Sequence, residues 1–206
     1  MMLNEVKSAF HENRLAILIS AAVMVISIIL GYFLEPYLYS YLNPVVEHLI
    51  EEVESGAIKL AFADIFLNNL KVIIMMFVCG VIFCFSALIL SFNGFFVGYY
   101  VGTSENLFEV LLYIVPHGIF ELSSCVIACA SGFVLFNFAC RFLKALWNQE
   151  NDSISGKLKD SYSLSNDKLR QACILFVVSV VLMMIAGFIE TYLTIPIARF
   201  VLSILG

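Results

Sequence analysis

Two ionisable side chains, His117 and Glu121, lie inside a strongly apolar stretch of the chain. Both belong to the segment Pro-His-Gly-Ile-Phe-Glu-Leu at residues 116–122, and their spacing of four places them on one face of a helix. A carboxylate at the centre of a membrane helix costs about 2.5–3.5 kcal/mol on insertion scales, so such groups usually face a bundle interior or a wet cavity. The pair therefore serves either the architecture of the bundle or its chemistry.

A metal site built from this helix face alone fails on geometry. His117, Glu121, Cys125 and Cys129 recur every four residues and form one slanted stripe. Their side chains suit zinc or copper. However, four points along about 18 Å of helix cannot converge on one ion, and at most two could share an ion with ligands from other helices. We therefore predict no metal site and no cofactor.

The sequence contains none of the motifs GxxxxGKS/T, GxSxG or HExxH that mark nucleotide-binding and hydrolytic proteins. His11 and His48 are typical of surface histidines. No serine or cysteine has an identifiable base at a matching depth, except through Glu121 or His117. We expect a protein that is not an enzyme and has no nucleic-acid partner.

The composition indicates a membrane protein. Of the 206 residues, 62% are apolar and 13% are charged, and the mean hydropathy is +0.98. Soluble domains carry about 25% charged residues, so little of this chain is expected to lie outside lipid. Its cysteines lie within apolar segments or at their ends, and we interpret them as free thiols that pack against other side chains. They are Cys79, Cys84, Cys125, Cys129, Cys140 and Cys173.

Four apolar segments meet the requirement of about 20 residues for a bilayer crossing. A fifth stretch, 92–115, is interrupted by Thr-Ser-Glu-Asn at 103–106, and each of its halves is too short to cross alone. The four clear segments comprise residues 15–34, 67–90, 118–140 and 171–195.

The basic residues decide whether the stretch 92–115 crosses. If it does, eight of the eleven lysines and arginines fall on the side of the N-terminus. If it dips in and returns, the basic loop 141–170 and the N-terminal segment lie on opposite sides. Because cytoplasmic segments are enriched in Lys and Arg, we predict five crossings of the plasma membrane, with a cytoplasmic N-terminus and an external C-terminus. The predicted fold is an all-α transmembrane bundle that forms one domain over 1–206, with a broken or short third helix.

Two connecting segments differ in charge. The external loop 35–66 is acidic, and apolar residues at helical spacing within it predict a short surface helix. This helix presents either a solvated face against the membrane or a docking surface for a protein partner. The basic loop 141–170 is predicted to be a flexible cytoplasmic linker.

Small residues recur every four positions in the third and fourth predicted helices. Such repeats allow backbones to approach closely where lipid supplies no hydrophobic drive. We expect contact between these two helices within the chain, with a seam between two copies as the alternative. The repeats are Gly94, Gly98 and Gly102, and Ser124, Ala128 and Gly132.

Polar residues far apart in sequence are predicted to share one depth near the external surface. Pro116 suits the first turn of the fourth helix, which puts His117 and Glu121 close to that surface. Glu121 and Glu190 could then accept hydrogen bonds from asparagines across the helix interface. The layer is either a set of polar staples or an outward cavity of the kind a transporter uses. It comprises Asn68, Asn69, His117, Glu121, Glu190, Thr191 and Thr194.

Four stretches together resemble the stage II sporulation protein M family, most strongly over residues 66–196. They are Phe66-Leu-Asn-Asn-Leu-Lys71, Phe92-Asn-Gly94, Pro116-His-Gly-Ile-Phe-Glu-Leu122, and Gly187-Phe-Ile-Glu190 followed by Thr194 and Pro196. The resemblance implies family-pattern positions at Asn68, Asn69, Asn93, His117, Gly118, Glu121 and Glu190, with Asn93 at the inner turn of the third helix.

The resemblance also implies a function. The family's named member looks like a membrane scaffold that anchors peptidoglycan-remodelling enzymes during engulfment, and other members occur in organisms that do not sporulate. We therefore expect a non-enzymatic scaffold whose partners are membrane lipids and proteins docked on 35–66, with a homo-oligomer as a further expectation. The alternative is a small transporter or permease-like subunit that uses an outward polar site of Glu121, His117, Glu190 and Asn68.

Overall fold

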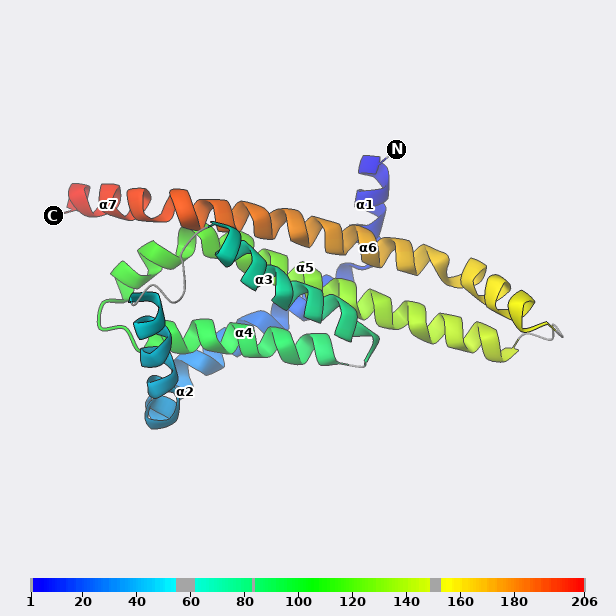
Figure 1. The fold of residues 1–206 in the computed structure, drawn as a ribbon, viewed down its shortest axis with the longest axis horizontal. Coiled ribbons are helices and arrows are strands. Elements are labelled where there is room, and N and C mark those ends of the chain that lie inside the picture. The colour runs from blue at the N-terminus through cyan, green and yellow to red at the C-terminus, as the bar shows by residue number, and fades with distance from the viewer. Residues whose placement is uncertain (1, 55–61, 83, 149–152, 206) are drawn as a thin grey trace.

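A computed structural model describes residues 2–54, 62–82, 84–148 and 153–205, and helices account for nearly all of them (Figure 1). Within these ranges no strand occurs, and the predicted all-α bundle is confirmed. The elements are α1 (Met2–Glu12), α2 (Arg14–Glu54), α3 (Phe62–Val78), the 3-10 helix η1 (Cys79–Val81), α4 (Phe85–Gly102), α5 (Leu107–Asn148), α6 (Ile154–Tyr192) and α7 (Thr194–Leu205).

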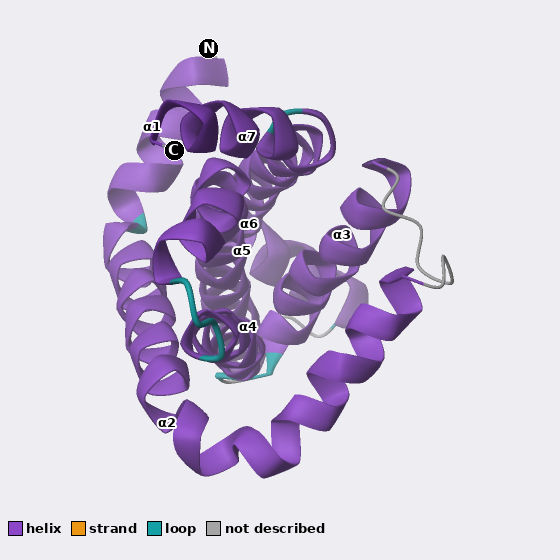
Figure 2. Cartoon of the chain, turned by 90° about the vertical axis from the view of Figure 1, so that its left-hand side faces the viewer, coloured by secondary structure: helices purple, strands orange, loops and turns teal. Residues whose placement is uncertain are grey.

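Five helical segments are long and apolar enough to cross a membrane: α2, α3 with η1, α4, α5 and α6. The long helices α5 and α6 run side by side through the centre, with α2 on one flank and α3 on the other (Figure 2). The C-terminal part of α2, a helix that contains Pro36 and Pro44, turns away from the bundle axis (Figures 1 and 2). A proline inside a helix lacks the N–H of one backbone hydrogen bond and bends the helix there.

The third crossing helix is short, as one of the two predicted alternatives has it, and it is not broken. Helix α4 is continuous from Phe85 to Gly102, and residues 107–115 belong to α5. The polar residues 103–106 separate two crossings, and the Asn106 side chain accepts a hydrogen bond from the Glu109 N–H at 3.2 Å, as an N-cap does. The break falls instead within the predicted segment 67–90, where Cys84 has a positive φ of 61°. Hydropathy misses this turn because its residues are as apolar as the helices beside it.

Both connecting segments are more helical than expected. Helix α2 runs on to Glu54, and α3 begins at Phe62, so most of the predicted loop 35–66 is helix. Side chains 45–54 and residues 55–61 lie outside the described part of the chain, and the docking surface expected there stays a prediction. The expected flexible linker 141–170 is also wrong, because α5 reaches Asn148 and α6 starts at Ile154. Both segments were expected to be loops because their hydropathy is low. Low hydropathy shows only that a segment lies outside lipid, and polar residues form helices as well as apolar ones do.

The glycine repeat of α4 packs on α2. The predicted contact between the third and fourth helices exists, but Gly132 of α5 and Ser86 of α4 make it, and the glycine repeat does not. A Cβ added at Gly98 would collide with the Ile28 carbonyl, and one at Gly94 would lie 3.0 Å from the Met24 carbonyl. Gly102 faces the side chain of Glu35, which also belongs to α2. The repeat predicted a close helix contact, but spacing carries no information about the partner.

The small residues of α5 mark the centre of the bundle. The Ser124 hydroxyl donates to the Ser179 carbonyl of α6 at 2.7 Å, and Ala128 is fully buried. Gly132 leaves room for the backbone of α3 at Met76 and for the Ser86 side chain of α4. Helix α5 therefore contacts α6, α3 and α4 through residues too small to hold them apart.

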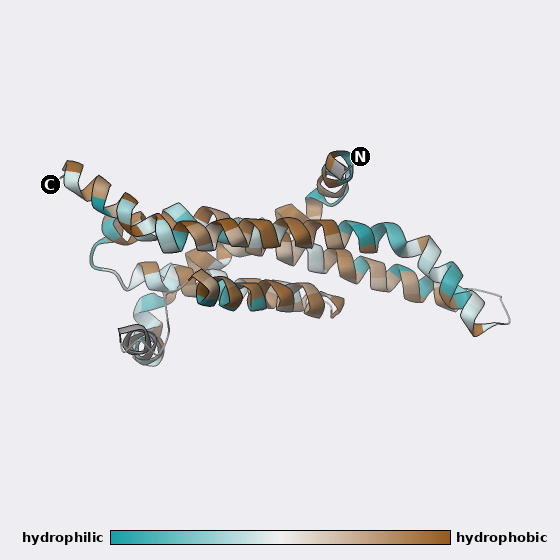
Figure 3. Cartoon of the chain, turned by 45° about the horizontal axis from the view of Figure 1, so that its top comes forward, coloured by the Kyte–Doolittle hydropathy of each residue, from teal (hydrophilic) through white to brown (hydrophobic). Residues whose placement is uncertain are grey.

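The two ends of the bundle differ. Helix α1 lies on the side of the bundle from which α5 and α6 project, well short of their far ends, and α7 lies at the opposite end (Figure 1). This arrangement suits an odd number of crossings, although the assignment of the first end to the cytoplasm stays a prediction. Hydrophobic residues dominate the middle of the bundle. Hydrophilic residues are frequent in the projecting part of α6, whereas that of α5 is mixed (Figure 3).

Candidate functional site

Three ionisable side chains meet between α5 and α6 and form what we call the α5–α6 cluster: His117, Glu121 and Glu190. One ring nitrogen of the histidine and one carboxylate oxygen of each glutamate all lie within 4.8 Å of one another. All three residues are half-buried. The antiparallel packing of two long helices thus brings together groups that are 69 positions apart in the chain, between Glu121 and Glu190.

Thr194 determines which nitrogen of His117 is protonated. Its hydroxyl lies 3.2 Å from the Ile189 carbonyl and 3.3 Å from His117 Nδ1. Because a carbonyl only accepts, the single hydroxyl proton is directed at Ile189, and the threonine oxygen accepts from the Nδ1–H group. This assignment, made from the hydrogen-bond network, leaves the lone pair on Nε2 available to a ligand.

Local sequence places these groups beside a proline in α5 and beside the junction of α6 and α7. Pro116 is the tenth residue of α5, so its expected place in the first turn of a helix is wrong. Its missing N–H removes a backbone hydrogen bond next to the cluster. Helix α6 ends at Tyr192 and α7 begins at Thr194, which puts this threonine at the junction of the two helices.

The remaining members of the predicted polar layer do not join the cluster. Asn68 is exposed and Asn69 is half-buried on α3, and among the described residues neither donates a hydrogen bond to Glu121 or Glu190. The Thr191 hydroxyl donates to the Gly187 carbonyl of its own helix at 2.8 Å. Asn93 lies in the middle of α4, away from any inner turn.

The cysteines of the predicted stripe point into the core. Cys125 and Cys129 pack with Met24, Ile73 and Leu90 in one buried apolar cluster. The four residues of the stripe therefore have two different environments. His117 and Glu121 lie beside Glu190, whereas the two cysteines pack in the apolar core. The sequence argument against four ligands from one helix holds, but it could not reveal a third ligand contributed by α6.

The α5–α6 cluster has an unbalanced charge. In the part of the chain that the structure describes, no lysine or arginine forms an ion pair with Glu121 or Glu190. Two carboxylates face each other in a bundle whose neighbouring residues are largely apolar. Like charges at short range repel strongly where water is scarce, so the two carboxyls are both ionised only if a cation joins them, and otherwise one keeps its proton.

Sequence reasoning missed a second polar group, which we call the α1–α6 cluster: Glu12, Asn13, Lys168 and Gln171. Lys168 Nζ donates to Glu12 at 3.2 Å and to Gln171 at 2.7 Å. Gln171 Nε2 donates to Glu12 at 2.7 Å, and Asn13 Nδ2 donates to Gln171 Oε1 at 2.9 Å. The amphipathic pattern of residues 2–12 could have indicated this contact, because the apolar face of such a helix packs against another element.

Hydrogen bonds lower the pKa of Glu12 in this cluster to about 2, from an ordinary value of 4.5. The largest cause is the bond from Gln171, followed by those from Ser8 and Lys168. The Ser8 hydroxyl lies 2.8 Å from the carboxylate. Each bond favours the ionised form, so the α1–α6 cluster is a satisfied and charge-balanced contact.

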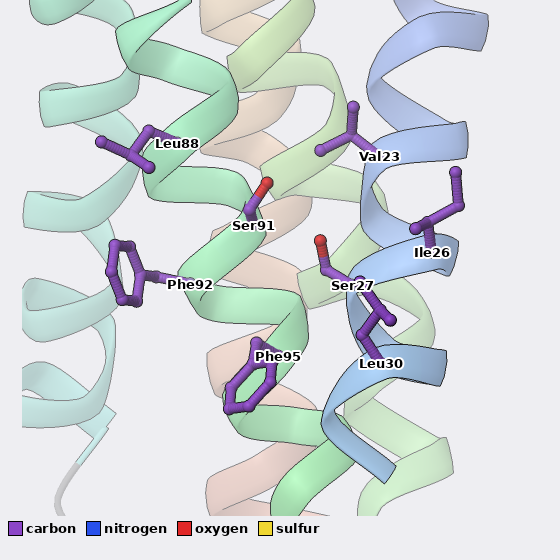
Figure 4. A pocket seen from close by; sticks show the side chains of 8 residues that line it. All are labelled: Val23, Ile26, Ser27, Leu30, Leu88, Ser91, Phe92 and Phe95. Carbon is purple, nitrogen blue, oxygen red and sulfur yellow. The ribbon is translucent and has the colours of Figure 1, made fainter. Parts of the chain in front are cut away.

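The bundle also carries an apolar groove of about 390 Å³ between α2 and α4 (Figure 4). The hydroxyls of Ser27 and Ser91 are its only polar side chains, and Ser91 donates to the Ala87 carbonyl. The groove presents no ionisable group, and its chemistry suits a hydrocarbon chain. Its lining is Val23, Ile26, Ser27, Leu30, Leu88, Ser91, Phe92 and Phe95.

Fold and site together define a polytopic helical membrane protein with an ionisable cluster inside its apolar bundle. The model of the family described as "Stage II sporulation protein M" matches residues 20–195. The chain therefore belongs to the stage II sporulation protein M family, which confirms the resemblance seen in the sequence.

Two curated relatives come from the archaeon Methanocaldococcus jannaschii. "Uncharacterized protein MJ0793" is 36% identical over 151 residues, which cover 71% of this chain and 78% of that protein. "Uncharacterized protein MJ0706" is 27% identical over 213 residues, which cover 98% of this chain and 91% of that protein. No solved structure matches the chain. The similarity extends over most of each protein, and the relatives' names state no activity.

Proposed function

We propose that this protein is a non-enzymatic membrane scaffold that binds a protein partner through the projecting hairpin, residues 137–148 of α5 and 154–170 of α6. Family membership supports an integral-membrane role. The observation that carries the docking proposal is the exposure of Trp147, which is 90% exposed on this hairpin.

Helix length supports a position of the hairpin outside the bilayer. Helices α5 and α6 contain 42 and 39 residues, whereas α3 and α4 contain 17 and 18. At about 1.5 Å per residue each helix of the long pair is about twice the hydrocarbon thickness of about 30 Å. The turn between α3 and α4 lies beside Gly132, where Gly80 approaches it. Residues beyond 137 therefore extend past the shorter helices into water.

Large apolar side chains on this hairpin face outward. Leu143 is 62% exposed one helical turn before Trp147, and Leu164 on the opposing helix is 65% exposed. Apolar groups gathered on a surface in water mark an interaction site, and tryptophan is enriched among the residues that dominate binding energy.

A basic groove lies beside these side chains. It has a volume of about 390 Å³ and is lined by Arg141, Lys144, Ala145, Asn148 and Leu164. This lining fits a partner segment that presents an apolar anchor with acidic neighbours. The expected docking surface on 35–66 and association between copies remain separate predictions.

Photo-crosslinking in cells tests the proposal. A photoreactive phenylalanine at position 162, where Tyr162 is 46% exposed, should give a discrete adduct with another protein. Adding Trp147→Asp should abolish the adduct and change stability by no more than about 0.5 kcal/mol, because the side chain packs against little. The same probe in place of Phe200 on α7, which is 66% exposed, is the control. An adduct that survives Trp147→Asp contradicts the proposal.

A second function, a small transporter or permease-like subunit, is favoured by the α5–α6 cluster. Ionisable groups within a membrane bundle commonly mark a proton or solute pathway. Under this alternative, Glu121→Gln leaves the protein folded and abolishes a proton-linked flux in liposomes. A folded variant with intact partner capture, and no flux in either form, removes this alternative.

A further inference from the structure

We propose that His117, Glu121 and Glu190 bind one divalent transition-metal ion, for which Zn²⁺ is the probe. The inference is independent of partner docking on the projecting hairpin, because the two regions lie at different ends of α5. It differs from the stripe rejected on sequence grounds, since its third ligand comes from α6 and neither cysteine takes part.

The geometry needs little rearrangement to form such a site. One ring nitrogen of His117 and one carboxylate oxygen of each glutamate already lie within 4.8 Å of one another. Ligands at about 2.0–2.2 Å from a tetrahedral ion lie roughly 3.3 Å apart, so closure requires movements of about 1.5 Å or less. Rotation of the carboxylates and the imidazole ring supplies movements of this size without changing the backbone.

The surroundings prepare the histidine as a ligand. Thr194 is 6% exposed and accepts the Nδ1–H, so Nε2 carries the lone pair that a metal needs. Ligating histidines generally donate their second ring nitrogen to such an outer partner, which holds the tautomer and the orientation. Thr194 is a positioning residue here, and it does not contact the ion.

Charge favours a divalent ion over an empty pair of acids. Glu121 and Glu190 have no basic ion-pair partner among the residues placed by the structure. A divalent cation between them offsets both carboxylate charges. The imidazole nitrogen selects first-row transition metals over Mg²⁺ and Ca²⁺, which prefer oxygen ligands alone. Three protein ligands leave a fourth position for water or an exchangeable ligand.

Equilibrium dialysis with Zn²⁺ tests the proposal on the full chain purified in detergent without metal. The wild type should bind one Zn²⁺ per chain, with no competition from excess Mg²⁺. Glu121→Gln and Glu190→Gln should each weaken binding at least a hundredfold, while Glu109→Gln, a matched change on an exposed residue of α5, should leave it unchanged. His11→Ala controls for adventitious binding by a surface histidine.

Two further measurements keep the test decisive if a glutamine variant fails to fold. Thr194→Val should weaken Zn²⁺ binding about ten- to hundredfold. Cobalt substituted in the wild type should give weak visible bands typical of oxygen and nitrogen ligands, without the intense ultraviolet band of a cobalt–thiolate bond. Folded protein that takes up no Zn²⁺, binding that all cluster variants retain, or a cobalt–thiolate spectrum would each overturn the proposal.

Discussion

Helix α6 carries one polar cluster near its middle, where its apolar segment begins, and another near its C-terminal end, and the two clusters accommodate charged groups differently. In the α1–α6 cluster a lysine, a carboxylate and two amides satisfy one another. In the α5–α6 cluster two carboxylates and a histidine meet, and the structure describes no basic residue that pairs with the acids. The first cluster is complete in itself, whereas the second is completed by a cation from outside the chain.

The position of each cluster explains the difference. The α1–α6 cluster lies where an amphipathic helix crosses the end of the apolar segment of α6, and Glu12 remains partly exposed. A long, flexible lysine can reach a partner there that keeps contact with water, because the Glu12 side chain is 45% exposed. The α5–α6 cluster lies inside the crossing segments, where an additional lysine would itself require desolvation. The chain therefore supplies its own counter-charge in the α1–α6 cluster and supplies none in the α5–α6 cluster.

The largest effect is expected from breaking the balanced cluster. Lys168→Met removes the donor to Glu12 and Gln171, and its side chain is only 9% exposed. We expect a loss of about 1–3 kcal/mol in the free energy of unfolding, because a buried acceptor loses its partner. Thermal melting in detergent measures the shift. Lys159→Met on the exposed surface of the same helix is the control, and equal shifts in both variants would make the α1–α6 cluster energetically unimportant.

The α5–α6 cluster should respond in the opposite direction when metal is absent. Glu121→Gln removes one of two facing negative charges and keeps the shape of the side chain. We expect the metal-free variant to be at least as stable as the wild type, with a gain of up to about 1 kcal/mol from relieved repulsion. Melting with excess chelator measures this change. A loss comparable to that of Lys168→Met would mean that Glu121 is a structural staple.

Added Zn²⁺ should stabilise the protein only through the α5–α6 cluster. Ligand that binds only the folded state raises stability by about 2.7 kcal/mol at one hundred times its Kd. We therefore expect added Zn²⁺ to raise the melting temperature of the wild type and of Lys168→Met equally, and to leave Glu190→Gln unchanged. If Zn²⁺ stabilises Glu190→Gln as much as the wild type, the ion binds elsewhere.

The smallest effect is the acid sensitivity of the α1–α6 cluster. The pKa of Glu12 is lowered to about 2 in the folded protein, from 4.5. A lowered folded-state pKa contributes stability above the unfolded pKa, and that contribution is lost as the pH falls from about 4.5 towards 2. Replacing the carboxylate by an amide in Glu12→Gln should flatten the stability curve in this window only. A curve that keeps its slope between these pH values would assign the acid sensitivity to other groups.

The errors of the sequence analysis share one physical cause. Apolar composition predicted five crossings, because transfer into lipid depends on local hydropathy. It assigned the interruption at 103–106 to the inside of one crossing, although these residues separate two helices. It missed the turn at Cys84, because a turn between apolar helices leaves no trace in hydropathy. The spacing of Gly94 and Gly98 predicted a close contact but not that α2 would be the partner.

For the candidate site, too, the sequence predicted the local features and the tertiary structure decided the rest. The chain alone determined that His117 and Glu121 share a helix face within an apolar segment, because helical periodicity is a local property. Only the antiparallel packing of α5 and α6 decided that Glu190 and Thr194 join His117, while Asn68, Cys125 and Cys129 do not. Convergence of groups from different helices depends on helix rotation and register, which long-range packing sets and no local pattern encodes.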